Sequence, residues 1–180
     1  MRVKHTLRMI HVGKPLLGRF TRTVPVTLFR IQVGAAAKLR PEASATAAGR
    51  KSFDICCAPD SDAVAPRDPA EPRFLGPNGM SLRLAGHMCG VIVGTFRGRG
   101  ARVFEVRQGV SIPEELVLLH EHTDNYSLQP AVPMTLDELN AGLTRFLAQP
   151  GVVVHKSKDA FWAAFPEMSP AAVGCDDASP

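Results

Sequence analysis

The chain has 180 residues, of which 45% are hydrophobic and 21% are charged, a composition typical of a globular protein with one hydrophobic core. It contains no run of about 18 apolar residues, so the sequence predicts no membrane-spanning helix. The four cysteines form no Cys-x-x-Cys pair, which argues against a cysteine-based zinc site and favours a reducing, cytoplasmic environment.

The formal net charge of +4 is unevenly distributed along the sequence. All charged residues before Glu42 are basic. We predict that residues 1–23 form a basic, flexible leader, and their charge pattern is also typical of a mitochondrial targeting segment. Residues 166–180 contain acidic residues and no arginine or lysine, and they are predicted to be a disordered tail. The folded domain is therefore expected between residues 24 and 165.

Strand-like segments dominate the first two thirds of this domain. β-Branched and aromatic residues predict a first strand at residues 24–31. An Ala-rich stretch at residues 34–50 is limited by proline and glycine to a short helix, and the proline-rich residues 58–72 are predicted to be a long surface loop. The turn signal Gly-Pro-Asn-Gly at residues 76–79 introduces the next strand. Further strands are predicted at residues 80–84, 102–106, 117–122, 125–129 and 152–154.

One amphipathic helix has clear start signals. Thr135 and Glu138 have the spacing of a capping box, in which the two side chains satisfy free N–H groups of the first turn. Apolar residues follow at helical spacing, so residues 135–149 are predicted to be a helix and residues 158–165 a shorter one. Residues 90–94 form a short buried run. The whole pattern predicts an α+β domain with a mixed, mostly antiparallel sheet.

Residues 116–129 carry the most informative polar pattern. Ionisable and polar side chains lie there between two strand-like runs, as expected for a ligand cleft. On a regular strand His120 and His122 share one face while Glu121 points to the other, so the three cannot form one catalytic cluster. A single His-x-His pair is a weak signal, and we predict no metal site.

Other motifs give weaker or negative signals. Arg97, Arg99 and Arg102 form a basic turn, which is typical of a solvated hairpin tip and which leaves nucleic-acid binding as an alternative. The sequence contains no glycine-rich dinucleotide loop, phosphate-loop lysine or nucleophile elbow. Nothing in the sequence pairs a cysteine with a base, so a nucleophilic cysteine is not predicted.

Three segments carry a family resemblance. The first is the Leu-aromatic-Arg strand at residues 27–30, and the second is the polar strand at residues 77–83. The third, residues 109–146, contains Ile112-Pro113, Asn125-Tyr126-Ser127 and a helix that ends in Leu143 to Phe146. In order and spacing they resemble a type VI secretion effector toxin family with an ADP-ribosyltransferase-like fold, which has bacterial and fungal members.

The resemblance implies a split sheet over residues 24–165 that holds NAD in a cleft. It also implies a glycosyltransferase activity, in which the toxin transfers ADP-ribose from NAD to an intracellular target or hydrolyses NAD. A cognate immunity protein is the implied partner if the chain is bacterial. The resemblance does not identify the acceptor of the ADP-ribose.

The family's functional residues can be carried over position by position. Arg30 matches an Arg or His on the first strand, and Ser81 matches a Ser or Tyr on the second. Arg30 and Arg83 are then expected to hold NAD, Ser81 to orient the ribose or brace the arginine, and Tyr126 to stack on nicotinamide. The group that polarises the ribose is one of Glu121, Asn125 and Gln129. The expected catalytic residues are thus Arg30, Ser81, Glu121, Asn125 and Tyr126, and the expected NAD-binding residues are Arg30, Ser81, Arg83, Tyr126 and Gln129.

One position departs from the family pattern. Relatives tend to have a histidine just before the tyrosine, where this chain has Asn125. An Asn side chain can hydrogen-bond a ribose, but it cannot act as an acid or base near neutral pH. This departure favours, as an alternative, a catalytically inactive pseudoenzyme. The other alternative is a nucleic-acid-binding module that uses the basic leader and the turn at Arg97 to Arg102.

Overall fold

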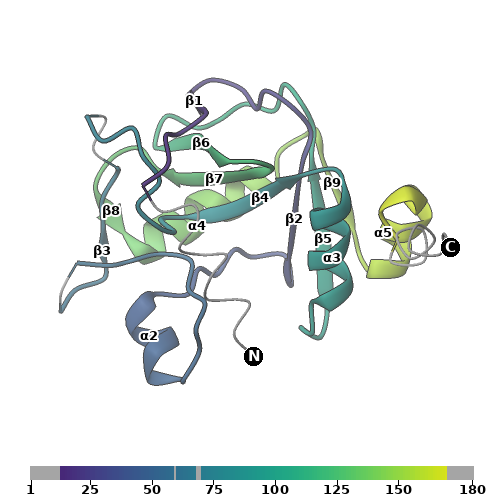
Figure 1. Cartoon of the computed structure of the whole chain (residues 1–180), viewed down its shortest axis with the longest axis horizontal. Helices are drawn as coiled ribbons and strands as arrows, with labels where there is room; N and C mark the ends of the chain where they lie inside the picture. Colours follow the sequence, from purple (N-terminus) through teal and green to yellow (C-terminus); the bar gives the residue numbers. More distant parts are fainter. Residues whose placement is uncertain (1–12, 59, 68–69, 170–180) are drawn as a thin grey trace, which may run out of the picture.

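The computed structural model of the chain describes residues 13–58, 60–67 and 70–169. Within these ranges a seven-stranded sheet has the strand order β1-β6-β7-β4-β2-β5-β9, with all neighbours antiparallel, and β3 pairs with β8 in a second sheet (Figure 1). The strands are β1 (Gly18–Phe20), β2 (Leu28–Val33), β3 (Ala63–Val64), β4 (Met80–Leu84), β5 (Ala101–Val106), β6 (Leu116–His122), β7 (Asn125–Pro130), β8 (Met134–Thr135) and β9 (Val152–His155). The helices are α2 (Glu42–Ala47), α3 (His87–Thr95), α4 (Leu136–Leu147), α5 (Lys158–Ala164) and the 3-10 helix η1 (Pro166–Met168).

The large sheet splits between β2 and β4. β2 pairs with β5 along its full length, from Leu28 to Val33, but it pairs with β4 only at Leu28 and Phe29. From Arg30 onward the two strands diverge, and they run in clearly different directions in Figure 1. The α+β class with a mostly antiparallel, split sheet is therefore confirmed, and the split leaves a space beside Arg30.

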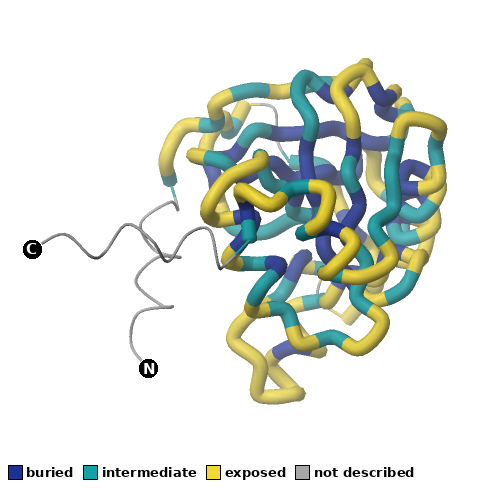
Figure 2. Tube along the Cα trace, turned by 90° about the vertical axis from the view of Figure 1, so that its right-hand side faces the viewer, coloured by how far each residue is buried: buried dark blue, intermediate teal, exposed yellow. Residues whose placement is uncertain are grey.

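Two clusters of buried side chains stabilise the two parts of the sheet. In the first cluster, Leu139, Leu143 and Phe146 of α4 pack on β4, β6 and β7. In the second, α3 and α5 cover β2 and β5, and the rings of Phe29 and Phe161 meet edge to face at 5.7 Å between centroids. In Figure 2 the buried segments, in dark blue, run through the interior of the fold. Each buried Leu or Phe side chain contributes roughly 1.5–3 kcal/mol, so both clusters hold the split in place.

The capping box predicted at the start of α4 is confirmed. The Thr135 hydroxyl accepts a hydrogen bond from the Glu138 backbone N–H, and the Glu138 carboxylate accepts one from the Thr135 backbone N–H. A side chain of α4 also binds the segment that follows β2. Asn140 Oδ1 accepts a hydrogen bond from the backbone N–H of Leu39 at 2.9 Å. This contact brings the next residue, Arg40, to the split between β2 and β4.

Helix α3 is the longest of the described elements that the sequence did not reveal. Residues 90–94 were expected as a short buried run, and they lie inside α3. The helix has apolar residues on nearly every side, so it shows no amphipathic period. It packs so closely on η1 that a Cβ atom at Gly90 would overlap the carbonyl oxygen of Met168.

The described fold extends past both predicted domain boundaries. Gly18–Phe20, inside the predicted leader, form β1 and pair with Leu118 to His120 of β6. Met168, inside the predicted tail, is only 1% exposed. Residues 1–12 of the leader and residues 170–180 of the tail lie outside the described residues. No helix in the described ranges is long and apolar enough to cross a membrane.

Candidate functional site

A cavity of about 210 Å³ opens where β2 and β4 diverge. β2 and β4 supply its polar side chains, and α3 supplies an apolar wall. Arg40, from the segment that follows β2, completes the lining. The lining residues are Phe29, Arg30, Ile31, Arg40, Ser81, Arg83, Cys89, Ile92, Val93 and Phe96. Three arginines around one small cavity indicate a site for an anionic group.

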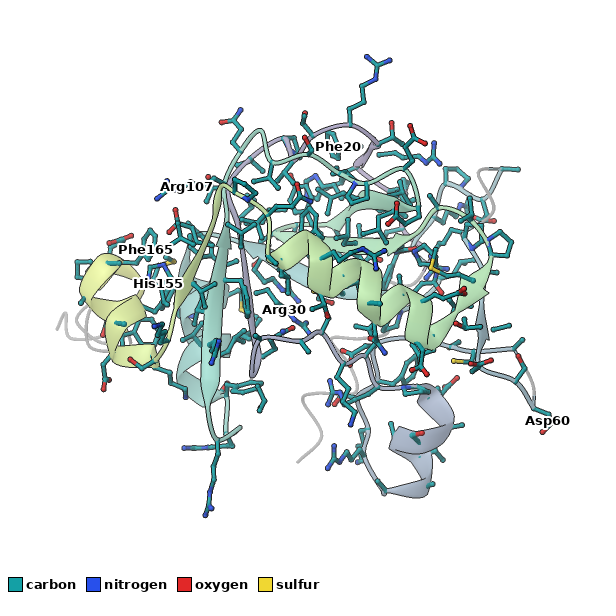
Figure 3. The ribbon with its side chains drawn as sticks, turned by 180° about the vertical axis from the view of Figure 1, so that it is seen from behind. Phe20, Arg30, Asp60, Arg107, His155 and Phe165 are labelled. Carbon is teal, nitrogen blue, oxygen red and sulfur yellow. The ribbon has the colours of Figure 1, made fainter. Side chains whose placement is uncertain are left out.

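Arg30 extends from β2 into the split between the strands. Its Nη1 donates a hydrogen bond to the carbonyl oxygen of Ser81 at 3.2 Å. Its Nε is buried and has no hydrogen-bond partner among the described residues. Burial lowers the pKa of Arg30, and the nearby Asp54 carboxylate partly offsets this effect. Figure 3 shows Arg30 in the interior, between β2 and α4, so a buried N–H donor remains for a ligand in the cavity.

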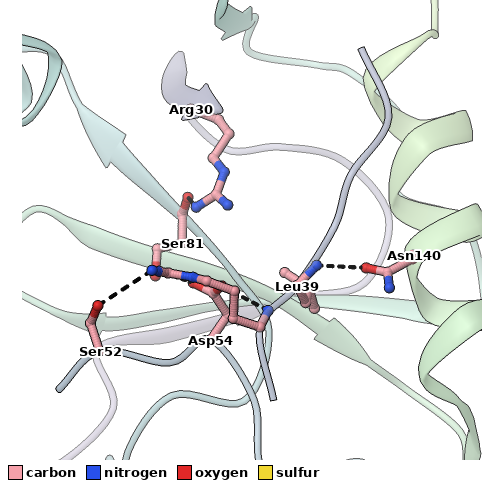
Figure 4. A network of polar contacts seen from close by, with 7 residues as sticks. Arg30, Leu39, Ser52, Asp54, Ser81 and Asn140 are labelled. Carbon is pink, nitrogen blue, oxygen red and sulfur yellow. Dashed lines mark hydrogen bonds and ion pairs between the residues drawn. The ribbon is translucent and has the colours of Figure 1, made fainter. Parts of the chain in front are cut away.

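Arg40 is held in place by a buried carboxylate. Its Nε donates to Asp54 Oδ2 at 2.9 Å and its Nη2 donates to Asp54 Oδ1 at 3.3 Å, the forked geometry of a bidentate ion pair. A third nitrogen, Nη1, donates to the Ser52 hydroxyl at 3.4 Å (Figure 4). The hydrogen bond to Asp54 raises the pKa of Arg40. Asp54 is therefore already engaged by Arg40 and does not form an ion pair with Arg30.

Ser81 and Arg83 lie on one face of β4 and both line the cavity. Arg83 Nη1 forms an ion pair with Asp124 Oδ1 at 2.7 Å, and both side chains are mostly buried. Across the sheet, Ser81 lies opposite Ser127 of β7 and Arg83 lies opposite Asn125. Because paired residues in antiparallel strands share a face, the polar face of the cavity continues onto β7.

Glu121 forms a buried polar cluster on this continuation. It is only 2% exposed, and its carboxylate accepts hydrogen bonds from Asn125 Nδ2 at 2.7 Å and from Gln129 Nε2 at 2.9 Å. Burial raises the pKa of Glu121 to about 7, against the opposing effects of Arg67, Arg83 and the two amide donors. A carboxyl group in this range can take up or release a proton near neutral pH, and such perturbed groups concentrate at functional sites.

Tyr126 lies on the opposite face of β7. Its ring is buried among the residues under α4, and it stacks on His120 with 4.1 Å between ring centroids. Successive residues on a strand alternate between faces, so Tyr126 points away from the cavity when Asn125 points to its side. The predicted role of Tyr126 as a stacking platform does not fit this position. The aromatic side chains that line the cavity are those of Phe29 and Phe96.

The structure thus divides the predicted residues into three groups. Arg30, Ser81 and Arg83 meet around the cavity. Next to them on the same face, but outside the residues that line the cavity, lies the hydrogen-bonded cluster of Glu121, Asn125 and Gln129. Tyr126 is the one predicted site residue on the opposite face, where it stacks on His120. His120 and Glu121 point to opposite faces, as expected. The expectation that His120 and His122 share a face is wrong, because the bulge between them pairs His120 with Tyr126 and His122 with Asn125, which lie on opposite faces of β7.

Sequence reasoning missed Arg40 and Asp54. Fourteen positions separate them along the chain and neither belongs to a motif, so only the folded structure reveals their pairing. It also missed the α3 side chains in the cavity wall, because α3 itself was not predicted. One of these is Cys89, whose thiol pKa is raised by burial to about 12. A thiol with so high a pKa is almost fully protonated near neutral pH, and the thiolate is the nucleophilic form.

Comparison with known proteins identifies the family. The chain matches the family described as Tse2 ADP-ribosyltransferase toxin over residues 26–158, a range that contains β2, β4, β6, β7 and every predicted site residue. No significant match was found among curated proteins. None was found among solved structures either. The match covers most of the chain and all the residues that surround the cavity, and on this evidence the chain belongs to the Tse2 ADP-ribosyltransferase toxin family.

Proposed function

We propose that the chain binds NAD in the cavity between β2 and β4 and transfers its ADP-ribose to a macromolecular acceptor inside a cell, or to water. The main support for this proposal is the unsatisfied N–H donor of the Arg30 guanidinium. Its Nε is buried and lacks a hydrogen-bond partner among the described residues, while the nearest carboxylate is paired with Arg40. A buried donor of this kind is costly unless a ligand satisfies it. The diphosphate of NAD is an anion that Arg30 can bind.

The size of the cavity limits which part of NAD it holds. At about 210 Å³ it is smaller than the roughly 300–1,000 Å³ of pockets that enclose whole cofactor-sized ligands. It therefore suits the diphosphate and an adjoining ribose, with the rest of NAD outside. In this arrangement Arg30 binds the diphosphate and Ser81 hydrogen-bonds the ribose. Phe29 and Phe96 supply the apolar surface for a ring.

The chemistry of the transfer requires little beyond positioning and charge. When the bond between nicotinamide and ribose breaks, its electron pair leaves with neutral nicotinamide and the ribose becomes positively charged. The acceptor nucleophile, or water, then forms the new bond to the ribose and loses its proton. Groups that hold the diphosphate and stabilise the ribose cation lower the barrier. Arg30 holds the diphosphate, and Ser81 positions the adjoining ribose.

We assign the stabilisation of the ribose cation to the cluster around Glu121. Asn125 lies opposite Arg83 across the sheet, and it donates a hydrogen bond to Glu121. In this assignment Asn125 orients the ribose, and Glu121 provides negative charge when ionised. Gln129 holds the Glu121 carboxylate in position from the other side. Tyr126 has no part in the proposal because it lies on the opposite face.

The test is protein labelling with biotin-NAD in a cell extract, together with an assay for free nicotinamide. Arg30→Ala is expected to abolish both signals, and Arg30→Lys is expected to retain only part of them because lysine lacks the planar fork. Arg99→Ala is the matched control, since Arg99 is exposed in the turn between α3 and β5 and does not line the cavity. Labelling that persists unchanged in Arg30→Ala would remove the cavity from the mechanism.

The same experiment separates the alternatives. A pseudoenzyme is favoured by Asn125, whose side chain cannot transfer protons, and it would bind NAD without releasing nicotinamide. A nucleic-acid-binding module would bind DNA or RNA with an affinity that falls steeply with salt, and Arg99→Ala would weaken it. Membership of a toxin family also supports a cognate immunity protein as a partner.

A further inference from the structure

We propose that Arg40 is a positioning residue of the NAD site: by engaging the Asp54 carboxylate, it keeps the Arg30 guanidinium free to bind the anionic part of the ligand. The inference rests on the proposed NAD site and deepens it. It assigns Arg40 an indirect action, through Asp54, in place of direct contact with NAD.

The first step is that Arg40 donates hydrogen bonds to both carboxylate oxygens of Asp54. Both carboxylate oxygens accept hydrogen bonds from the Arg40 side chain, at 2.9 and 3.3 Å, and Oδ2 also accepts one from the Arg40 backbone N–H at 2.9 Å. The Asp54 side chain is only 10% exposed, so water does little to solvate it. Figure 4 shows Asp54 in the same polar network as Arg30 and Ser81.

The second step is that Asp54 stays in place when the Arg40 guanidinium is removed. Its backbone N–H donates to the carbonyl oxygen of Arg40 at 2.9 Å, and its own carbonyl oxygen accepts a hydrogen bond from Gly79 at 2.9 Å. These contacts use main-chain atoms alone, so a substitution of the Arg40 side chain leaves them intact. The carboxylate would remain near the cavity without its cationic partner.

The third step is that the unpaired Asp54 would turn to Arg30. The two groups already interact, because the Asp54 charge raises the pKa of Arg30 against the effect of burial. A buried carboxylate that has lost its partner is costly, and the nearest cation with a free donor at this cavity is Arg30. The new pair would compete with the diphosphate for the same guanidinium.

Two explanations of Arg40 therefore predict different double variants. If Arg40 acts through Asp54, Arg40→Met weakens NAD binding, and adding Asp54→Asn restores it because no carboxylate is left to capture Arg30. If Arg40 contacts NAD directly, Asp54→Asn cannot restore the lost contact. Asn at position 54 keeps an oxygen that accepts the Arg40 backbone N–H, so the local chain path is preserved.

The experiment measures NAD dissociation constants for the parent, Arg40→Met, Asp54→Asn and the double variant, each checked for folding by thermal unfolding. We expect Arg40→Met to bind about tenfold or more weakly, as for a lost charge-assisted contact, and the double variant to return to within about threefold of the parent. Asp54→Asn alone is expected to bind no more weakly than the parent. A double variant as weak as Arg40→Met, or an Arg40→Met protein that binds like the parent, would overturn the inference.

A second readout needs no NAD and separates this inference from the proposed function. In protein labelled with ¹⁵N-arginine, the Nε–H signal of Arg30 is expected to exchange more slowly with water in Arg40→Met and to return to its parent rate in the double variant. If the parent does not bind NAD but this pattern is seen, the proposed function is wrong, while the inference that Arg40 keeps Asp54 away from Arg30 stands. If the Arg30 signal does not respond to Arg40→Met, the role of Arg40 is wrong whatever NAD does.

Discussion

The raised pKa of Glu121 predicts a specific pH dependence of stability. In the folded protein burial raises this pKa to about 7 from an ordinary value of 4.5. The fold therefore favours the protonated carboxyl group. The stabilisation is fully present below pH 4.5, and it is lost as the pH rises through 7. The Glu121→Gln variant, which cannot ionise, lacks this dependence.

The size of the effect follows from the shift. A difference of about 2.5 pKa units corresponds to roughly 3 kcal/mol at high pH, and most of it develops between pH 5 and 8. Gln at position 121 accepts fewer hydrogen bonds from Asn125 and Gln129, which costs about 1 kcal/mol at every pH. We therefore expect Glu121→Gln to be slightly less stable than the parent at pH 5 and about 2 kcal/mol more stable at pH 8.

The assay is urea unfolding of both proteins at several pH values between 5 and 8, with a common linear extrapolation. Glu114→Gln is the matched control, because Glu114 is exposed and lies in the loop before β6. Its stability should follow that of the parent at each pH. Unfolding free energies of the parent and Glu121→Gln that stay parallel across this range would show that burial does not raise the pKa of Glu121.

Other predictions concern the elements that shape the site. Thr135→Ala removes the hydroxyl of the α4 capping box and should lower the free energy of unfolding by about 1 kcal/mol in urea, whereas Thr135→Ser should not. Gly90→Ala should lower the melting temperature and weaken NAD binding, because its side chain would overlap the Met168 carbonyl and displace α3 from the cavity wall. In contrast, a Cβ atom added at Gly142 in α4 meets its nearest atom at 3.8 Å, so Gly142→Ala should stabilise the protein by up to about 1 kcal/mol. Equal effects of Gly90→Ala and Gly142→Ala on the melting temperature would contradict this expectation.

The elements predicted correctly are those with strong local signals. β4 follows a proline-glycine turn and alternates apolar and polar residues, and α4 begins with a capping box and keeps a helical period. Helix α3 has neither kind of signal, since its residues are apolar on nearly every side and include two glycines and several β-branched residues. Its conformation depends on packing against β2, β4 and η1, which the local sequence does not encode.

The site shows the same division between local and long-range information. Arg30, Ser81 and Arg83 were assigned to the site because their strands resemble those of the family, and the split sheet brings them to one cavity. Asn125 and Tyr126 were both assigned to the site, although strand alternation allows only one of two neighbours to face it. The pair of Arg40 and Asp54 depends on a contact between a segment tied to α4 and a distant loop, so no sequence pattern predicts it.

The ion pairs around the cavity determine which of its arginines carries an uncompensated charge. Arg40 is paired with Asp54 and Arg83 is paired with Asp124, so both of these cations are compensated by the protein itself. Arg30 donates to a neutral carbonyl oxygen and is the arginine of the cavity that lacks such an ion pair among the described residues. The affinity for an anion should therefore depend mainly on Arg30.

The most direct measurement of the central claim is calorimetric titration of NAD into the parent, Arg30→Ala and Arg99→Ala proteins at one salt concentration. We expect Arg30→Ala to weaken binding by about tenfold to a hundredfold, as for a lost charge-assisted hydrogen bond, and Arg99→Ala to bind like the parent. Equal NAD affinities of the parent and a folded Arg30→Ala protein would contradict the assignment of the cavity.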